Sequence, residues 1–176
     1  MPMLTPQWTP LTILAYGWGI LGVCASLVTG LLRLSPRTLE AFSMELEPIH
    51  WAFAVIWTIF MAYSEGYRGF QGRFSPTVVA RAVHLTNDPH PLRVILAPFF
   101  CMGFFHGTRK RMILTWSLTL GIIALVLYVH SIAQPWRGLI DLGVLAGLTW
   151  GMISLLVLAI RAVRAGTDWD PQLPAA

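Results

Sequence analysis

Two uncharged apolar runs of twenty-two residues each constrain this chain more than any other feature. They cover residues 11–32 and 112–133. As a helix, each run reaches ~33 Å, which is enough to cross the ~30 Å hydrocarbon layer of a bilayer. Two further apolar runs cover residues 49–67 and 139–160. The sequence therefore predicts four transmembrane helices.

The composition supports a membrane environment for the whole chain. Charged residues make up only 11% of the sequence and hydrophobic residues 56%, whereas about 25% of the residues of a soluble domain are charged. The mean hydropathy is +0.65. Because so few charges could not cover a water-exposed surface, we expect residues 1–176 to form one all-α integral membrane domain, a bundle of four transmembrane helices.

The segment 68–111 separates the second span from the third and contains an apolar stretch of uncertain role. That stretch, residues 94–105, reaches only ~18 Å as a helix, and Pro98 interrupts it. The short length and the proline favour a short re-entrant or interfacial helix on the cytoplasmic side, and a fifth span is the alternative. Before it, Ser75 and Pro76 are typical of a helix start. They predict a short surface helix with Arg81 and His84 pointing away from its valine-rich face.

The distribution of basic residues predicts the orientation of the chain. With four spans, nine of the twelve basic residues fall on the side that holds both termini, and three fall on the other side. Five spans give a less asymmetric split of seven to five. The positive-inside rule prefers the first arrangement, so we expect both termini in the cytoplasm, with a bacterial inner membrane as the location. Membrane orientation accounts for the arginines, which excludes a nucleic-acid-binding surface.

Glycines at helical spacing mark two of the spans as packing elements. Gly143, Gly147 and Gly151 form two consecutive GxxxG steps, a pattern of the glycine-zipper type, and Gly19 and Gly22 lie on the small-residue face of the first span. Such faces let helix backbones approach closely. The partner stays open: the first span, a second copy of the chain, or a larger membrane complex.

Two histidines are the best cofactor-ligand candidates in the sequence. His50 opens the second span and His130 lies near the end of the third, at a similar depth near the outer interface. Two imidazoles on facing helices can hold a b-type haem. Their bulky neighbours Trp51 and Tyr128 argue against room for the ring, and hydrogen bonding to headgroups or water is the alternative. The sequence contains no HExxH pattern.

The run Arg109, Lys110 and Arg111 is a candidate site for anionic lipid headgroups, or it serves only to fix the orientation. Arg137 and Asp141 lie four residues apart near one end of the last span. That spacing predicts a local ion pair.

No catalytic signature is present: neither GxSxG, nor a Walker glycine loop, nor paired carboxylates within a span. These observations disfavour an enzyme. They favour a small multi-pass membrane protein that acts as a scaffold, assembly factor or accessory subunit through helix packing. A haem-binding electron carrier that uses His50 and His130, and an oligomeric small-molecule transporter, are the alternatives.

Overall fold

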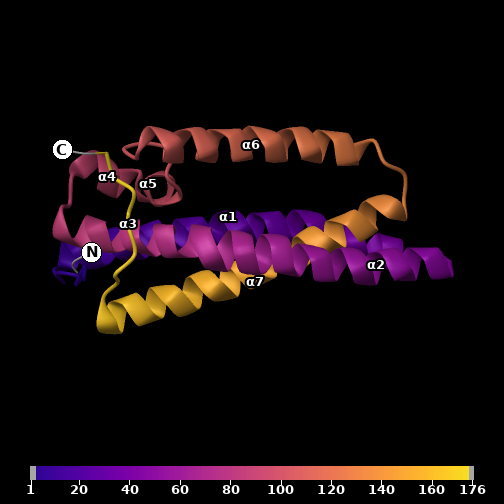
Figure 1. Ribbon diagram of the computed structural model, residues 1–176, viewed down its shortest axis with the longest axis horizontal. Coiled ribbons are helices and arrows are strands. Elements are labelled where there is room, and N and C mark those ends of the chain that lie inside the picture. The colour runs from indigo at the N-terminus through magenta and orange to yellow at the C-terminus, as the bar shows by residue number, and fades with distance from the viewer. Residues whose placement is uncertain (1–2, 175–176) are drawn as a thin grey trace.

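The computed structural model describes residues 3–174, and the regular structure of this part is all helical (Figure 1). Its elements, in chain order, are α1 (Pro10–Phe42), α2 (Pro48–Met61), the π-helix η1 (Ala62–Phe74), α3 (Ser75–Asn87), α4 (Pro91–Ile95), α5 (Ala97–Met102), α6 (Arg109–His130) and α7 (Trp136–Ala165). Three of them, α1, α6 and α7, are long and apolar enough to cross a membrane. The prediction of an all-helical fold with membrane-length apolar helices is confirmed at this level.

Helix α1 is longer than the first predicted span. It begins at a capping box, in which the Thr9 and Thr12 side chains each accept a hydrogen bond from the other residue's backbone N–H. It then continues past residue 32, where the predicted span ends, through Pro36, a residue type that usually kinks or ends a helix, and ends at Phe42. Packing on α7 stabilises this extension, because the Thr38 hydroxyl donates to the Gly138 carbonyl at 3.3 Å.

The second predicted span is part of a longer rod. Helices α2, η1 and α3 follow one another without a break from Pro48 to Asn87. The thirteen-residue π-helix is exceptional, because π-helices usually occur as single-turn bulges. Glycines lock it to α7: a Cβ on Gly66 would lie 2.8 Å from the Trp150 side chain, and a Cβ on Gly151 would lie 2.5 Å from the Phe70 ring.

Helix α3 is not the surface helix that the sequence predicts. Val78, Val79 and Val83 are fully buried and pack with residues of α1 and α7 in the main core of the described chain. Arg81, predicted to point away from this face, is also 0% exposed. The valine face was recognised from its spacing, but the opposite face is covered by the chain that follows, residues 97–106 and the C-terminal tail.

The ambiguous stretch 94–105 divides between α4, α5 and a turn, so it does not form a membrane-length helix. Helix α5 has six residues, which corresponds to ~9 Å. Figure 1 shows it between α1 and the first turns of α6. It packs on α1 where Gly19 and Gly22 leave room, and a Cβ at either position would collide with Cys101 or Pro98.

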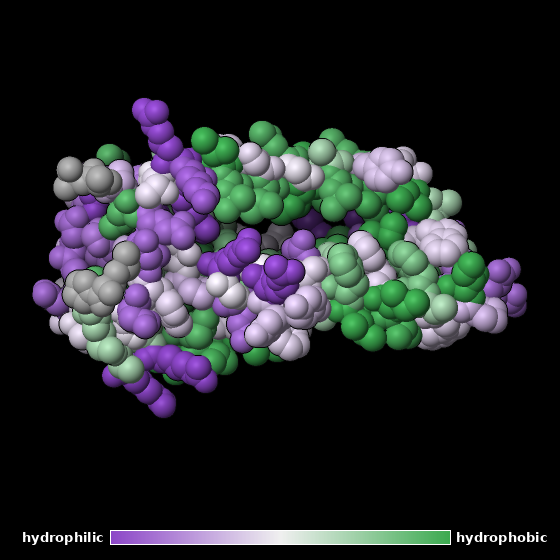
Figure 2. All heavy atoms as spheres, in the orientation of Figure 1, coloured by the Kyte–Doolittle hydropathy of each residue, from purple (hydrophilic) through white to green (hydrophobic). Residues whose placement is uncertain are grey.

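Both ends of the described chain lie at the same end of the molecule (Figure 1). Leu4 and Thr167 form an antiparallel bridge, with backbone hydrogen bonds of 2.7 and 2.9 Å. Hydrophilic residues gather at this end, whereas hydrophobic residues cover α6 (Figure 2). The arrangement separates a polar end, built from the termini, α3, α4 and the loop before α6, from an apolar body.

Candidate functional site

Arg81 organises the polar end of the molecule. Its Nε donates to the Phe100 carbonyl at 2.6 Å, and Nη1 donates to the Pro171 carbonyl at 3.0 Å. Nη2 donates to the carbonyls of Phe105 and His106 at 2.8 and 3.0 Å. One side chain of α3 thereby fixes α5, the loop that leads to α6, and the C-terminal tail.

The Arg81 guanidinium is balanced by carbonyl dipoles, since the described residues include no salt bridge to it. It also lies over the Phe100 ring, 4.2 Å from the ring centroid. Burial lowers the pKa of Arg81 to about 10, which still leaves the side chain charged at neutral pH. A charged group held this way stabilises the loop geometry.

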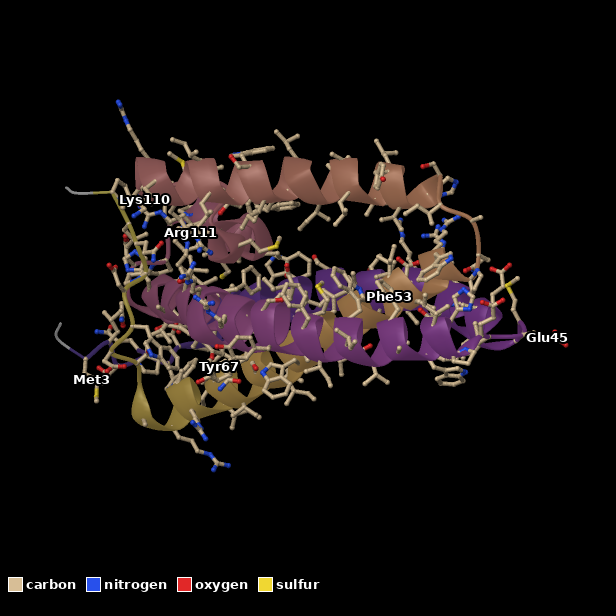
Figure 3. The ribbon with its side chains drawn as sticks, turned by 45° about the vertical axis from the view of Figure 1, so that its right-hand side comes forward. Met3, Glu45, Phe53, Tyr67, Lys110 and Arg111 are labelled. Atoms are coloured by element: carbon tan, nitrogen blue, oxygen red, sulfur yellow. The ribbon has the colours of Figure 1, made fainter. Side chains whose placement is uncertain are left out.

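The start of α6 is held by a second group of bonds to the same loop. Arg111 Nη2 and the Thr115 hydroxyl both donate to the Met102 carbonyl, at 3.2 and 3.3 Å. Trp116 Nε1 donates to the Phe104 carbonyl at 3.3 Å. The predicted lipid-headgroup cluster is therefore divided: Arg111 is buried, whereas Arg109 and Lys110 are exposed. Figure 3 shows Lys110 pointing away from the molecule and Arg111 pointing inward.

Beyond this anchored first part, α6 stands apart from the rest of the chain. In its most apolar window only 11% of the residues are buried, compared with 44% in α1 and 33% in α7. All residues from 120 to 128 are exposed. At its far end, the His130 ring lies 2.8 Å from Arg137 Nη2 of α7. Helix α6 is thus attached at its two ends and unpacked between them.

One face of α6 carries small residues that no part of the described chain covers. Ser117, Gly121 and Ala124 follow one another at i, i+4 and i+7, so they share a face, and all three are exposed. A Cβ on Gly121 would meet nothing within 4 Å. This stripe contains a single glycine and so lacks the GxxxG pattern; its small-xxx-small spacing is the signal that the sequence offers.

The predicted glycine stripe of α7 is occupied within the chain. A Cβ on Gly143 would lie 2.5 Å from the Trp57 ring, and one on Gly147 would lie 3.0 Å from Glu65 Cβ. With Gly151 against Phe70, the stripe accepts side chains of α2 and η1. It does not face the small residues of the first span, which was one of the predicted partners, because α5 covers Gly19 and Gly22.

The two histidines predicted as haem ligands belong to helix ends, His50 to the first turn of α2 and His130 to the last turn of α6. These two helix ends lie at the end of the molecule away from the termini (Figure 1). His50 Nδ1 accepts the Glu47 N–H at 3.1 Å, and its ring packs on Trp136. His130 Nδ1 faces Arg137 Nη2, and a guanidinium can only donate, so His130 accepts. Each ring thus uses one nitrogen within the chain. Residues 3–174 contain no group of three or more His, Cys, Asp or Glu side chains placed to bind a metal.

The local ion pair predicted for Arg137 and Asp141 does not form. Asp141 is 5% exposed, and its Oδ2 has no hydrogen-bond partner in the described chain. Arg137 Nε is likewise buried without a partner. The Arg137 side chain turns toward His130 of α6 instead, so the link between α6 and α7 replaces the pair within α7.

Comparisons with protein-family models, with curated proteins and with solved structures found no match to this chain. Function is therefore inferred from the exposed stripe of α6 and from the bonds that hold this helix in place.

Proposed function

We propose that this protein is a non-catalytic accessory subunit of the membrane, which binds a transmembrane helix of another membrane protein through α6. The observation that carries the proposal is the exposed stripe of Ser117, Gly121 and Ala124. Within lipid, helices associate mainly through close packing at small residues. The chain uses its other glycine stripes internally, and this stripe is left available.

The anchoring of α6 supports the same function. Arg81, Arg111 and the His130–Arg137 contact hold the two ends of the helix, so the stripe between them has a defined direction. A rigidly presented helix loses little freedom when a partner binds. Polar side chains are thus used to place an apolar surface.

We further propose the topology in which this surface works. Helix α2 and the first turns of η1 form the fourth span, alongside α1, α6 and α7. The polar end with both termini lies in the cytoplasm, on the cytoplasmic side of a bacterial inner membrane. The excess of basic residues at that end supports this orientation. A reporter that works only in the cytoplasm should be active when it is fused to the C-terminus. A reporter that works only outside the cytoplasm should be inactive there, and its activity would contradict the topology.

The docking proposal is tested by photo-cross-linking in native membranes. A photoreactive residue at Ala124, on the stripe, should give one discrete protein adduct. The same residue at Leu118, about 120° around the helix and 56% exposed, should give none. Gly121→Leu should abolish the adduct, because the larger side chain blocks close approach.

Gly17→Leu is the matched control, since Gly17 of α1 also has nothing within 4 Å of its Cβ position. It should leave the adduct intact. An adduct of twice the chain mass would identify a second copy as the partner. Lipid adducts alone at Ala124, or equal protein adducts at Ala124 and Leu118, would refute the proposal.

A further inference from the structure

The rod formed by α2 and η1 carries two hollows along one face, and they differ in chemistry. The first, of about 250 Å³, is lined by the apolar side chains of Phe53, Ile56, Trp57 and Phe60. The second, of about 180 Å³, is lined by Ser64, Arg68, Gly69 and Arg73. Phe53, Trp57, Phe60 and Ser64 follow one another at steps of three or four, so the two hollows continue one another along the helix.

The π-helix brings the two arginines together. Its i→i+5 hydrogen bonds stack residues five apart, and Arg68 and Arg73 are five apart. On an α-helix the same two side chains would point about 140° apart. Gly69 lies between them in the sequence and lines the same hollow without a side chain of its own.

The charges of this hollow are available to a ligand. Arg68 and Arg73 are both exposed at least in part, and neither guanidinium has an ion-pair partner among residues 3–174. Glu65, the acidic residue of η1, lies on the side that faces α7, where its Cβ approaches Gly147. The polar side chains that line the hollow are therefore two arginines and one serine, with no acidic residue among them.

Two tyrosines mark the depth of the site. Tyr63 and Tyr67 are exposed, and their rings stack with centroids 6.0 Å apart. Exposed tyrosines of this kind sit at the membrane–water interface. Figure 3 labels Phe53, which belongs to the apolar part of the rod, and Tyr67, which belongs to the part that we place at the interface. Phe53 to Ser64 spans ~16 Å, close to half of the ~30 Å hydrocarbon layer.

We propose that this face binds one anionic phospholipid of the cytoplasmic leaflet. An acyl chain lies along Phe53, Ile56 and Phe60, and the phosphate accepts hydrogen bonds from Arg68 and Arg73. The order of the two hollows, their charge and their length match the two parts of a lipid. The site lies on a different helix from the docking stripe of α6, so it goes beyond the proposed function and shares only the topology with it.

The experiment measures lipid binding to the purified full-length protein in neutral detergent by native mass spectrometry. Dipalmitoyl phosphatidylglycerol should bind as a single saturable molecule, more tightly than dipalmitoyl phosphatidylcholine. The double variant Arg68→Gln, Arg73→Gln should lower the phosphatidylglycerol affinity by about 30-fold, and each single variant by about 5-fold. The melting temperature should not change, because both side chains are on the surface.

The matched control is Arg161→Gln with Arg164→Gln, which removes two exposed arginines from the end of α7. It should leave the affinity unchanged. Equal losses in the two double variants, or equal binding of both lipids, would overturn the site. Equal binding of dihexanoyl and dipalmitoyl phosphatidylglycerol, or full competition by inorganic phosphate, would reduce it to an anion site without a chain groove and overturn the lipid proposal. Gly121→Leu should leave lipid binding intact, so this proposal and the docking proposal can fail separately.

Discussion

Replacing Arg81 by alanine should destabilise the polar end of the molecule more than any other exchange of a single arginine. The guanidinium donates four hydrogen bonds to backbone carbonyls, those of Phe100, Phe105, His106 and Pro171. Bonds to a charged group contribute about 1.5–3 kcal/mol each, which amounts to about 6–12 kcal/mol before opposing effects. The desolvation of a buried charge offsets several kcal/mol of this sum.

The net loss for Arg81→Ala should therefore be about 3–5 kcal/mol, which is what remains of the hydrogen-bond sum after the desolvation cost is subtracted. For a chain of this size, it corresponds to a fall in melting temperature of about 6–20 °C. Arg81→Lys should fall between the wild type and alanine, because one ammonium cannot reach both the Phe100 and the Pro171 carbonyls. Thermal unfolding in detergent, followed by circular dichroism, measures the shift.

Arg93→Ala is the matched control. Arg93 pairs with Asp88, and the Arg93 and Asp88 side chains are 16% and 61% exposed. Because water reaches the carboxylate of this pair, its loss should cost about 1 kcal/mol, well below the loss for Arg81→Ala. Carboxypeptidase trimming gives a second readout: only Arg81→Ala should speed removal of the tail that Pro171 anchors. If Arg81→Ala melts within about 2 °C of the wild type, a shift worth less than about 1 kcal/mol, then the carbonyl network does not stabilise this end and the reasoning is wrong.

Two further predictions concern the packing at Gly143 and the partly buried imidazole of His84. Gly143→Leu should destabilise the fold by at least about 1–3 kcal/mol through overpacking, because even a Cβ there would lie 2.5 Å from the Trp57 ring, and an unchanged melting temperature would contradict this. Burial lowers the pKa of His84 below its ordinary value of 6.5, despite the opposing effect of Asp88. As the pH falls below about 6.5, the unfolded chain binds a proton that the folded chain binds less readily, so stability should decline toward pH 5. His84→Gln should flatten that decline in melting curves recorded from pH 5 to 7, and an equal decline in the variant would show that other groups cause it.

The sequence predicted the helices whose apolar runs are long and uninterrupted, because length and hydropathy alone decide whether a helix can cross a bilayer. It failed where tertiary contacts override a local signal. Pro36 is a typical helix breaker, yet α1 passes through it because Thr38 is bonded to α7. The π-helix had no signal in the sequence, and it is accompanied by contacts between distant segments, in which Gly66 meets Trp150 and Gly151 meets Phe70.

The burial of Arg81 shows a second kind of limit. Its four carbonyl partners lie between 19 and 90 residues away along the chain. No spacing rule connects an arginine to carbonyls at such separations, and an arginine beside a valine-rich face is usually solvated. A buried, satisfied guanidinium could be found only once the chain after α3 was seen to fold back over it.

The glycines of α7 and the small residues of α6 show why the same pattern needs a structure to be interpreted. Both stripes have the spacing that permits close helix approach. In α7 the space is filled by Trp57 and Phe70 from the chain itself, so replacing a glycine there should lower the stability of the fold. In α6 the space at Gly121 is empty, so the same replacement should leave the fold intact and remove only association. The weaker sequence motif is therefore the better candidate for an intermolecular contact, because a stripe already used for folding cannot also bind a partner.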